Sequence, residues 1–234
     1  MRSGGRGTYR GGMLITEQLF LLLTRDDGKP VNAFAYNAYG LAAAAIADLV
    51  LAQRISLSDD KDPRVHVASS EPTGDRVLDH ALNRLRERDG KKLSSLVQDG
   101  KVNPETEVVA ALQRAGVVAV EAKRYLGFVP EKRPTLDPTP ERTVRERLRA
   151  VLAGSTPTVQ EATLLSILQG LDVAHTALKE EAPGMSKRDL KKRIEQAAGE
   201  VPEGTAVAKA VEALNTVLLT SVIIPVVVSS GGSS

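Results

Sequence analysis

The sequence has no cysteine and no tryptophan, and only 3% of its 234 residues are aromatic. Without cysteine, disulfides, zinc fingers and thiol catalysis are excluded. With so few aromatic side chains, stacking of single-stranded bases is a poor explanation of its function. Lysine and arginine number 31 against 29 aspartate and glutamate residues, so attraction to an anionic partner would need local clusters of charge.

No apolar run is long enough to predict a membrane span. The last one, residues 217–228, is interrupted by Pro225, whereas a span needs about 20 apolar residues. A longer span over 206–228 would include Lys209 and Glu212, whose charges are costly inside a bilayer. We therefore expect a buried terminal helix and not a tail anchor.

Motifs for catalysis or metal binding are also missing. The three histidines, His66, His80 and His175, lie on different predicted elements without paired ligand spacing. The sequence has neither a phosphate-binding loop of the Gly-x-x-x-x-Gly-Lys type nor a Gly-x-Ser-x-Gly elbow. We predict a protein that is not an enzyme, with no catalytic residues, no metal site and no cofactor.

The composition predicts one domain with short tails. Residues 1–12 are rich in glycine and arginine and have no apolar segment, so we expect a disordered tail and not a secretory signal. Residues 13–228 are expected to form the domain, and residues 229–234 a flexible tail.

Apolar spacing makes this domain mainly α-helical, with a buried central helical core and two peripheral β-hairpins. Residues 41–50 and 164–174 are apolar nearly all round, so we expect both to be buried and in contact. Further helices are predicted over 16–23, 37–52, 75–85, 93–97, 104–114, 141–152 and 158–178, from 186 through at least 193, and from 205 onward. The hairpins pair 54–57 with 64–67 and 116–120 with 124–128, each after a helix that ends in Gln-Arg, as in a loose repeat.

The stretch from Ser70 to Leu82 is the most distinctive in the chain. Thr73 is predicted to cap a helix whose apolar face starts at Val77. Its wording, Pro-Thr-Gly-Asp-x-x-Leu-Asp-x-Ala-Leu, resembles the Golgi phosphoprotein 3-like family, lipid-binding proteins of the Golgi surface with many bacterial relatives. Glu-x-Leu-x-Leu-Leu from Glu17 and Gly40 with the following leucine and small apolar helix extend the resemblance over most of the chain.

The resemblance implies a mostly helical, peripheral membrane protein that recognises phosphatidylinositol 4-phosphate. The family lines its head-group pocket with a tryptophan, an arginine after Gly-Leu and an Arg-x-x-Arg pair. This sequence departs from that pattern, with Ala42 after Gly-Leu and with Val102 and Glu105 where the arginine pair is expected; Phe34 or Tyr36 could stand in for the tryptophan. We therefore expect the fold to carry over, but not stereospecific recognition of the head group.

Local basic clusters supply a less specific route to a membrane. Lys123 and Arg124 are followed at once by Leu126 and Phe128, an arrangement that suits the boundary between lipid head groups and acyl chains. The arginines of 142–149 would add attraction to an anionic leaflet. The residues predicted to meet lipid are Phe34, Tyr36, Lys123, Arg124, Leu126, Phe128, Arg142 and Arg145.

We therefore predict a bacterial member of the family, cytoplasmic and peripheral to the inner face of the membrane. Its predicted partners are an anionic lipid, membrane-associated proteins and a further copy of the chain through the second hairpin. Nucleic acid is not an expected partner. Two alternatives stay open: a winged-helix-like nucleic-acid binder, because a helix precedes each hairpin, and a cytosolic scaffold for protein interactions.

Overall fold

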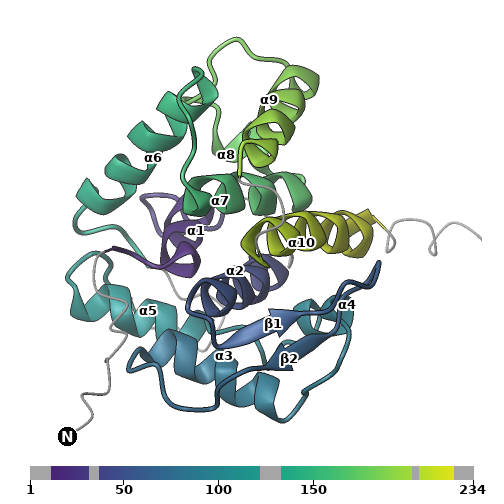
Figure 1. The fold of residues 1–234 in the computed structure, drawn as a ribbon. Coiled ribbons are helices and arrows are strands. Elements are labelled where there is room, and N and C mark those ends of the chain that lie inside the picture. The colour runs from purple at the N-terminus through teal and green to yellow at the C-terminus, as the bar shows by residue number, and fades with distance from the viewer. Residues whose placement is uncertain (1–11, 32–36, 122–132, 202–205, 224–234) are drawn as a thin grey trace, which may run out of the picture.

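The computed structural model describes residues 12–31, 37–121, 133–201 and 206–223, and it confirms a mainly α-helical single domain (Figure 1). Among the described residues, no helix is long and apolar enough to cross a membrane. In chain order the elements are α1 (Ile15–Leu23), α2 (Asn37–Leu51), β1 (Ile55–Leu57), β2 (Val65–Val67), α3 (Arg76–Arg86), α4 (Leu93–Val97), α5 (Glu105–Arg114), α6 (Thr139–Leu152), α7 (Val159–Gly170), α8 (Ala174–Ala177), α9 (Lys187–Gly199) and α10 (Ala206–Ile223).

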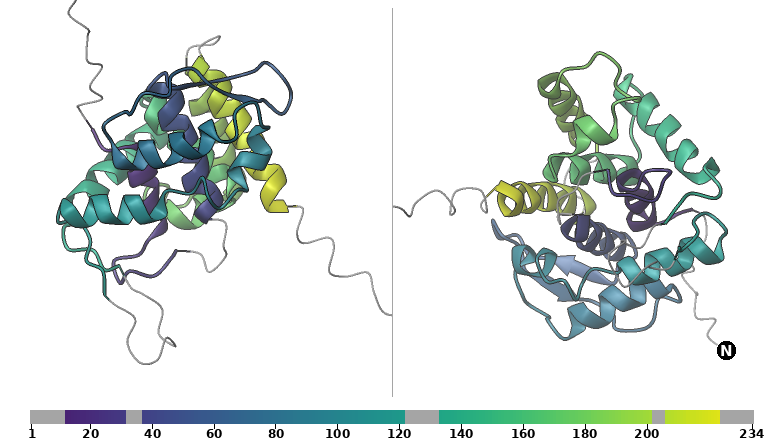
Figure 2. Two further views of the ribbon diagram at one scale, coloured as in Figure 1. Left: turned by 90° about the horizontal axis from the view of Figure 1, so that it is seen from below. Right: turned by 180° about the vertical axis from the view of Figure 1, so that it is seen from behind.

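The centre of the molecule is a group of packed helices, α1, α2, α7 and α10. In two views, α6, α8 and α9 lie on one side of this group, and α3, α4, α5 and the hairpin lie on the other (Figures 1 and 2). The predicted core is confirmed: every residue of 41–50 is buried, α2 contacts α7, and only Asp172 within 164–174 is exposed. Small side chains on all faces of α2 permit this close packing.

A glycine lets α10 approach α7. A Cβ atom added to Gly170 would lie 2.7 Å from Cβ of Leu218 and 3.4 Å from the carbonyl oxygen of Asn215. Real Cβ atoms do not come so close to their neighbours. The predicted terminal helix is therefore part of the core, and Leu214 and Leu218 are fully buried in it.

The predicted helix 158–178 is wrong as a single element. It is divided into α7 and α8, because Asp172 adopts a left-handed conformation with φ of 58°. Side chains other than glycine rarely take that conformation, and it ends a helix. Periodicity did not reveal the break, since the apolar residues continue in register across it.

The cap predicted for α3 is also wrong in its detail. Asp75 is the N-cap residue, and its carboxylate accepts hydrogen bonds from the amides of Val77 and Leu78 at 2.8 and 3.3 Å. The hydroxyl of Thr73 instead donates to Asp79 at 2.7 Å. The loop before α3 is therefore joined to the first turn of the helix by two acidic side chains, Asp75 and Asp79.

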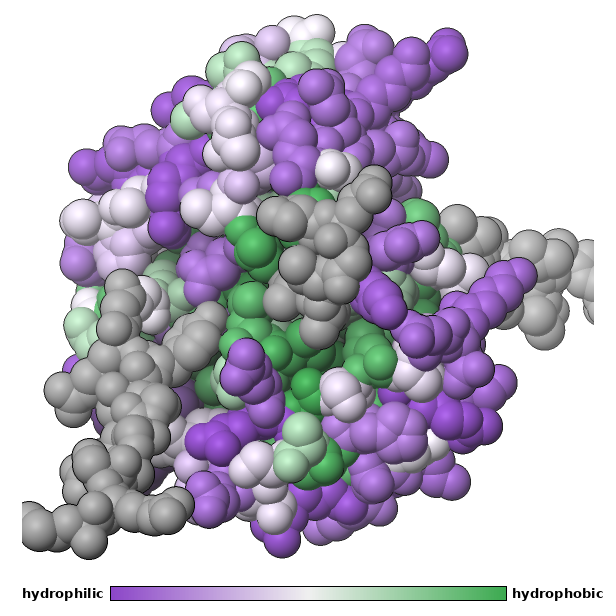
Figure 3. Space-filling model, in the orientation of Figure 1, coloured by the Kyte–Doolittle hydropathy of each residue, from purple (hydrophilic) through white to green (hydrophobic). Residues whose placement is uncertain are grey.

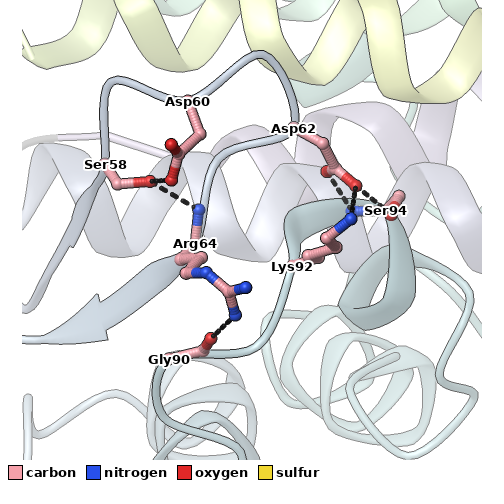
Figure 4. A network of polar contacts seen from close by, with 7 residues as sticks. All are labelled: Ser58, Asp60, Asp62, Arg64, Gly90, Lys92 and Ser94. Carbon is pink, nitrogen blue, oxygen red and sulfur yellow. Dashed lines mark hydrogen bonds and ion pairs between the residues drawn. The ribbon is translucent and has the colours of Figure 1, made fainter.

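The first hairpin is confirmed, with Ser56 opposite His66. Its connecting loop is held by polar contacts: the hydroxyl of Ser58 bonds Asp60, the carboxylate of Asp62 accepts from Ser94, and Arg64 donates to the carbonyl of Gly90 (Figure 4). The contact of Asp60 lies within the loop, whereas those of Asp62 and Arg64 join it to the start of α4 and the segment before it. Asp59 pairs with Lys209 of α10.

The second hairpin was predicted to pair 116–120 with 124–128. Among the described residues, Val118 pairs with Thr135, and the amide of Ala119 donates to the carbonyl of Pro134 at 2.9 Å. Residues 122–132 lie outside the described part of the chain. The partner that the structure gives to Val118 is therefore further along the chain than predicted.

Candidate functional site

The loop between α1 and α2 organises the candidate site. It begins as a tight turn, in which Thr24 bridges Pro30 and the amide of Arg25 donates to the carbonyl of Lys29 at 2.7 Å. Gly28 has a φ of +76°, a conformation that glycine adopts without strain. The backbone of this turn is therefore accessible for contact with residues 133–135.

Arg133 and its neighbours pack directly on this turn. A Cβ atom on Gly28 would lie 2.3 Å from the backbone nitrogen of Arg133, so the absence of a side chain allows the contact. The amide of Thr135 also donates to the carbonyl of Asp26 at 3.1 Å. We call residues 24–31, residues 133–135 and the first turn of α5 the loop junction.

The loop junction brings together described residues that lie close in sequence to two segments predicted to meet lipid. Residues 32–36 directly follow residues 24–31 of the loop junction, and residues 122–132 directly precede Arg133. Both segments lie outside the described residues. Six of the predicted lipid residues belong to these segments, and their own positions stay predictions: Phe34, Tyr36, Lys123, Arg124, Leu126 and Phe128. Their described flanks meet at one place, although the segments are far apart in sequence.

The guanidinium of Arg133 is held from two directions. It lies 5.7 Å from the ring centroid of Phe20, a distance suited to a cation–π contact. Its Nη1 donates to the carboxylate of Glu105, the first residue of α5. The side chains of Arg133 and Glu105 keep 26% and 36% exposure, so this ion pair lies at the surface of the junction.

The two predicted arginines of α6 have different surroundings. Arg142 is exposed, whereas Arg145 donates to Glu141 at 2.7 Å, to Glu181 at 3.1 Å and to the carbonyl of Ala177 at 2.9 Å. Burial raises the pKa of Glu141, an effect that Arg145 opposes. Arg145 therefore joins α6 to the segment after α8, and we do not include it in the lipid surface proposed below.

A pocket of about 510 Å³ lies beside the loop junction. Its charged lining has four acids and three bases: Asp26, Asp27, Glu141 and Glu180 against Arg25, Arg145 and Lys179. Because two of the bases already have carboxylate partners, the pocket offers little attraction to an anion. Its shape alone does not make it a head-group site.

Two further basic clusters of the sequence do not share one face. The cluster at the end of α3 (Arg84, Arg86 and Arg88) and the cluster on α9 (Lys187, Arg188, Lys191, Lys192 and Arg193) lie on opposite sides of the helical centre (Figure 1). Many of their side chains also have acidic partners, such as Arg84–Glu87, Arg88–Asp99, Lys187–Asp172, Lys191–Glu195 and Arg193–Glu200. A single cationic footprint that uses all of them is therefore excluded.

The face of the molecule seen in Figure 3 has an apolar middle, whereas the loop junction contains paired charges. Apolar residues gather in its middle, in the region of α2, and hydrophilic residues surround them. α2 itself is buried from Gly40 to Val50, so that stretch cannot serve as the recognition helix of a winged-helix protein. This arrangement gives the nucleic-acid alternative no support from the helix before the first hairpin.

The positions of the family's head-group arginines are filled by other residues. Ala42 and Val102 are fully buried, and Glu105 is paired with Arg133. A pocket that relies on arginines at these three positions is therefore missing from this chain. The cation at the loop junction comes from Arg133 instead, which is not among the residues predicted to meet lipid.

Asp48 is a buried polar residue that sequence reasoning missed. Its carboxylate accepts hydrogen bonds from the amides of Ile15 and Thr16, each at 3.0 Å, and from the hydroxyl of Thr16 at 2.7 Å. It thereby caps α1 from the middle of α2. Burial raises the pKa of Asp48 to about 7, although these hydrogen bonds oppose the shift. The only signal in the sequence was a lone acid in an apolar helix.

Among the described residues, no group of three or more His, Asp or Glu side chains is arranged to hold a metal ion. The prediction that the protein has no metal and no cofactor is not tested by this. In this structure, the polar groups described above form caps and ion pairs.

The fold and the block around Asp75 define a mainly helical domain with a buried helical centre, the architecture expected from the resemblance. The family model of Golgi phosphoprotein 3 (GPP34) matches residues 15–214, so the chain belongs to this family. A search of curated proteins found no match. Membership confirms the predicted family, whereas the predicted bacterial origin stays a prediction.

Proposed function

We propose that this protein is a non-enzymatic peripheral membrane protein that docks on anionic lipid through the loop junction and the two segments that extend from it. The observation that carries the proposal is the contact between Gly28 and Arg133. It brings the turn that precedes residues 32–36 into contact with the residue that follows 122–132, and we expect aromatic and cationic side chains of both segments to act together there.

Family membership supports the proposal that the protein binds lipid, and the residues of this chain suggest weak selectivity among lipid head groups. Because Ala42, Val102 and Glu105 replace the arginines of the family pocket, attraction would come from Lys123, Arg124 and their neighbours. Each such cation near an anionic leaflet contributes about 1 kcal/mol. Binding should therefore follow the charge of the membrane and not prefer phosphatidylinositol 4-phosphate at equal charge. In a bacterial cell, the surface would be the cytoplasmic face of the membrane.

Co-sedimentation with vesicles tests this proposal. Vesicles that contain phosphatidylserine, phosphatidylglycerol or phosphatidylinositol 4-phosphate at matched surface charge should bind the protein equally, and neutral vesicles should not. The double variant Lys123→Glu/Arg124→Glu should lose most of the binding. Lys191→Glu/Lys192→Glu on α9 is the matched control with the same change of charge, and it should bind nearly as well as the wild type.

Three outcomes would contradict the proposal in different ways. Equal loss of binding in both double variants would mean that only net charge matters. A strong preference for phosphatidylinositol 4-phosphate would mean that a specific pocket exists elsewhere. Tight, salt-sensitive binding to duplex DNA without binding to vesicles would favour the nucleic-acid alternative.

A further inference from the structure

The ion pair between Arg133 and Glu105 has a place in the fold that suggests more than stability. Arg133 is the first described residue after segment 122–132, and its backbone is pressed against Gly28. Its guanidinium lies over Phe20. The cation is thus fixed at the loop junction, where its position does not depend on Glu105 alone.

A guanidinium presents several N–H donors in one plane, and this fork fits a carboxylate and a phosphate group equally well. In this structure Glu105 supplies the carboxylate. The same donors cannot serve Glu105 and a lipid phosphate at full strength at the same time. Since both side chains are partly exposed, the pair is weak enough for another anion to compete with it.

We propose that Arg133 binds a lipid phosphate group at the loop junction and that Glu105 is a built-in competitor that lowers the affinity for the membrane. This inference rests on the proposed function and adds a regulation to it. The contact with Phe20 keeps the cation in place when the carboxylate is displaced. Docking is then weak and reversible, because each binding event first breaks an internal ion pair.

The variant Glu105→Gln tests the inference, because it keeps the size of the side chain and removes its charge. Its affinity for anionic vesicles should rise about fivefold, the effect of one further cation at an anionic leaflet, or about 1 kcal/mol. Glu105→Ala should give a similar gain. The gain should shrink as salt is added, because it is electrostatic.

Removal of any acidic residue makes the protein more cationic, so a matched control is needed. Glu87→Gln, at the C-cap of α3, also breaks an arginine–glutamate pair, with Arg84 at 3.3 Å, and it changes the net charge equally. It should change affinity much less than Glu105→Gln does. In the background of Arg133→Gln, the substitution Glu105→Gln should give no more gain than this control.

The outcomes separate this inference from the proposed function. Wild-type binding to anionic vesicles with no gain in Glu105→Gln beyond that of Glu87→Gln would overturn the inference alone. A full gain that persists in Arg133→Gln would overturn it as well, since the phosphate would then be bound by another group. If neither the wild type nor Glu105→Gln binds anionic vesicles better than neutral ones, both proposals are wrong.

Discussion

In the helical centre, α2, α7 and α10 bury mainly apolar and small side chains, whereas the buried surroundings of the loop junction contain paired charges. Leu41, Ile46 and Leu168 are fully buried in the first region. In the second, Glu181 is fully buried as a side chain and is matched by Arg145. The helical centre depends on how well apolar side chains fill its volume, and the surroundings of the loop junction depend on ion pairs. Substitutions in the two regions should therefore destabilise the protein for different reasons.

The largest expected effect is in the centre. Leu168→Ala should lower the free energy of unfolding by about 2–5 kcal/mol, because it removes a fully buried side chain and leaves a cavity. Urea denaturation would measure the change. Leu136→Ala is the control, since Leu136 is 63% exposed and its loss should cost less than about 0.5 kcal/mol. Equal stability of the two variants would mean that α7 is not central.

The next effect tests the region of paired charges. Arg145→Ala should cost about 3 kcal/mol, the lower part of the range for breaking a buried pair, since it leaves Glu181 without its closest cation. Arg147→Ala, at 3.9 Å from Glu161 and 45% exposed, should cost less than about 1 kcal/mol. Comparable thermal denaturation of both variants would contradict the structural role of Arg145.

A smaller effect tests how tightly the centre is packed. Gly170→Ala should destabilise the protein by about 1–3 kcal/mol, because the added methyl group would meet Leu218 at 2.7 Å. Gly199→Ala at the end of α9 has open space around it and should be neutral or slightly stabilising. If Gly170→Ala were also neutral, α7 and α10 would have room to separate.

A last effect, which builds up with pH and is small for each pH unit, concerns the one carboxylate of α2. The folded pKa of Asp48 is about 7, and an unfolded aspartate titrates near 3.9. Between these values the folded state holds a proton that the unfolded state releases, so stability should fall as pH rises from about 4 to about 7. The slope is at most about 1.4 kcal/mol per pH unit. Burial also raises the pKa of Glu17, which acts in the same direction.

Unfolding in urea at several pH values would measure this slope. Asp48→Asn cannot ionise at this position, so its stability should depend less on pH than that of the wild type. Asp27→Asn, at an exposed position, is the control and should keep the wild-type slope over this range. Parallel curves for the wild type and Asp48→Asn would show that Asp48 does not titrate in the folded protein.

The comparison also explains what the sequence could predict. Residues 41–50 and 164–174 were predicted correctly as the core because burial of apolar residues follows directly from their chemistry. The break at Asp172 was missed because it depends on one backbone torsion, and the apolar pattern continues across it.

The candidate site could be predicted less well. The pairs Arg145–Glu181 and Arg133–Glu105 join residues 36 and 28 positions apart, and no periodic pattern connects them. The cap that Asp48 gives to α1 is similar, since its partners are more than 30 positions away. Local spacing identifies helices, but the choice among many arginines and carboxylates is made only when distant segments meet.

The packing of α10 has a consequence for the folding of the protein during translation. α1, α2 and α7 are synthesised first, yet Gly170 and its neighbours await Leu218 of a helix that is made later. Until then, the side of α7 that faces α10 has no cover, and nascent chains that pause there expose a surface prone to aggregation. Chaperone demand should therefore be greatest late in translation, just before α10 emerges from the exit tunnel.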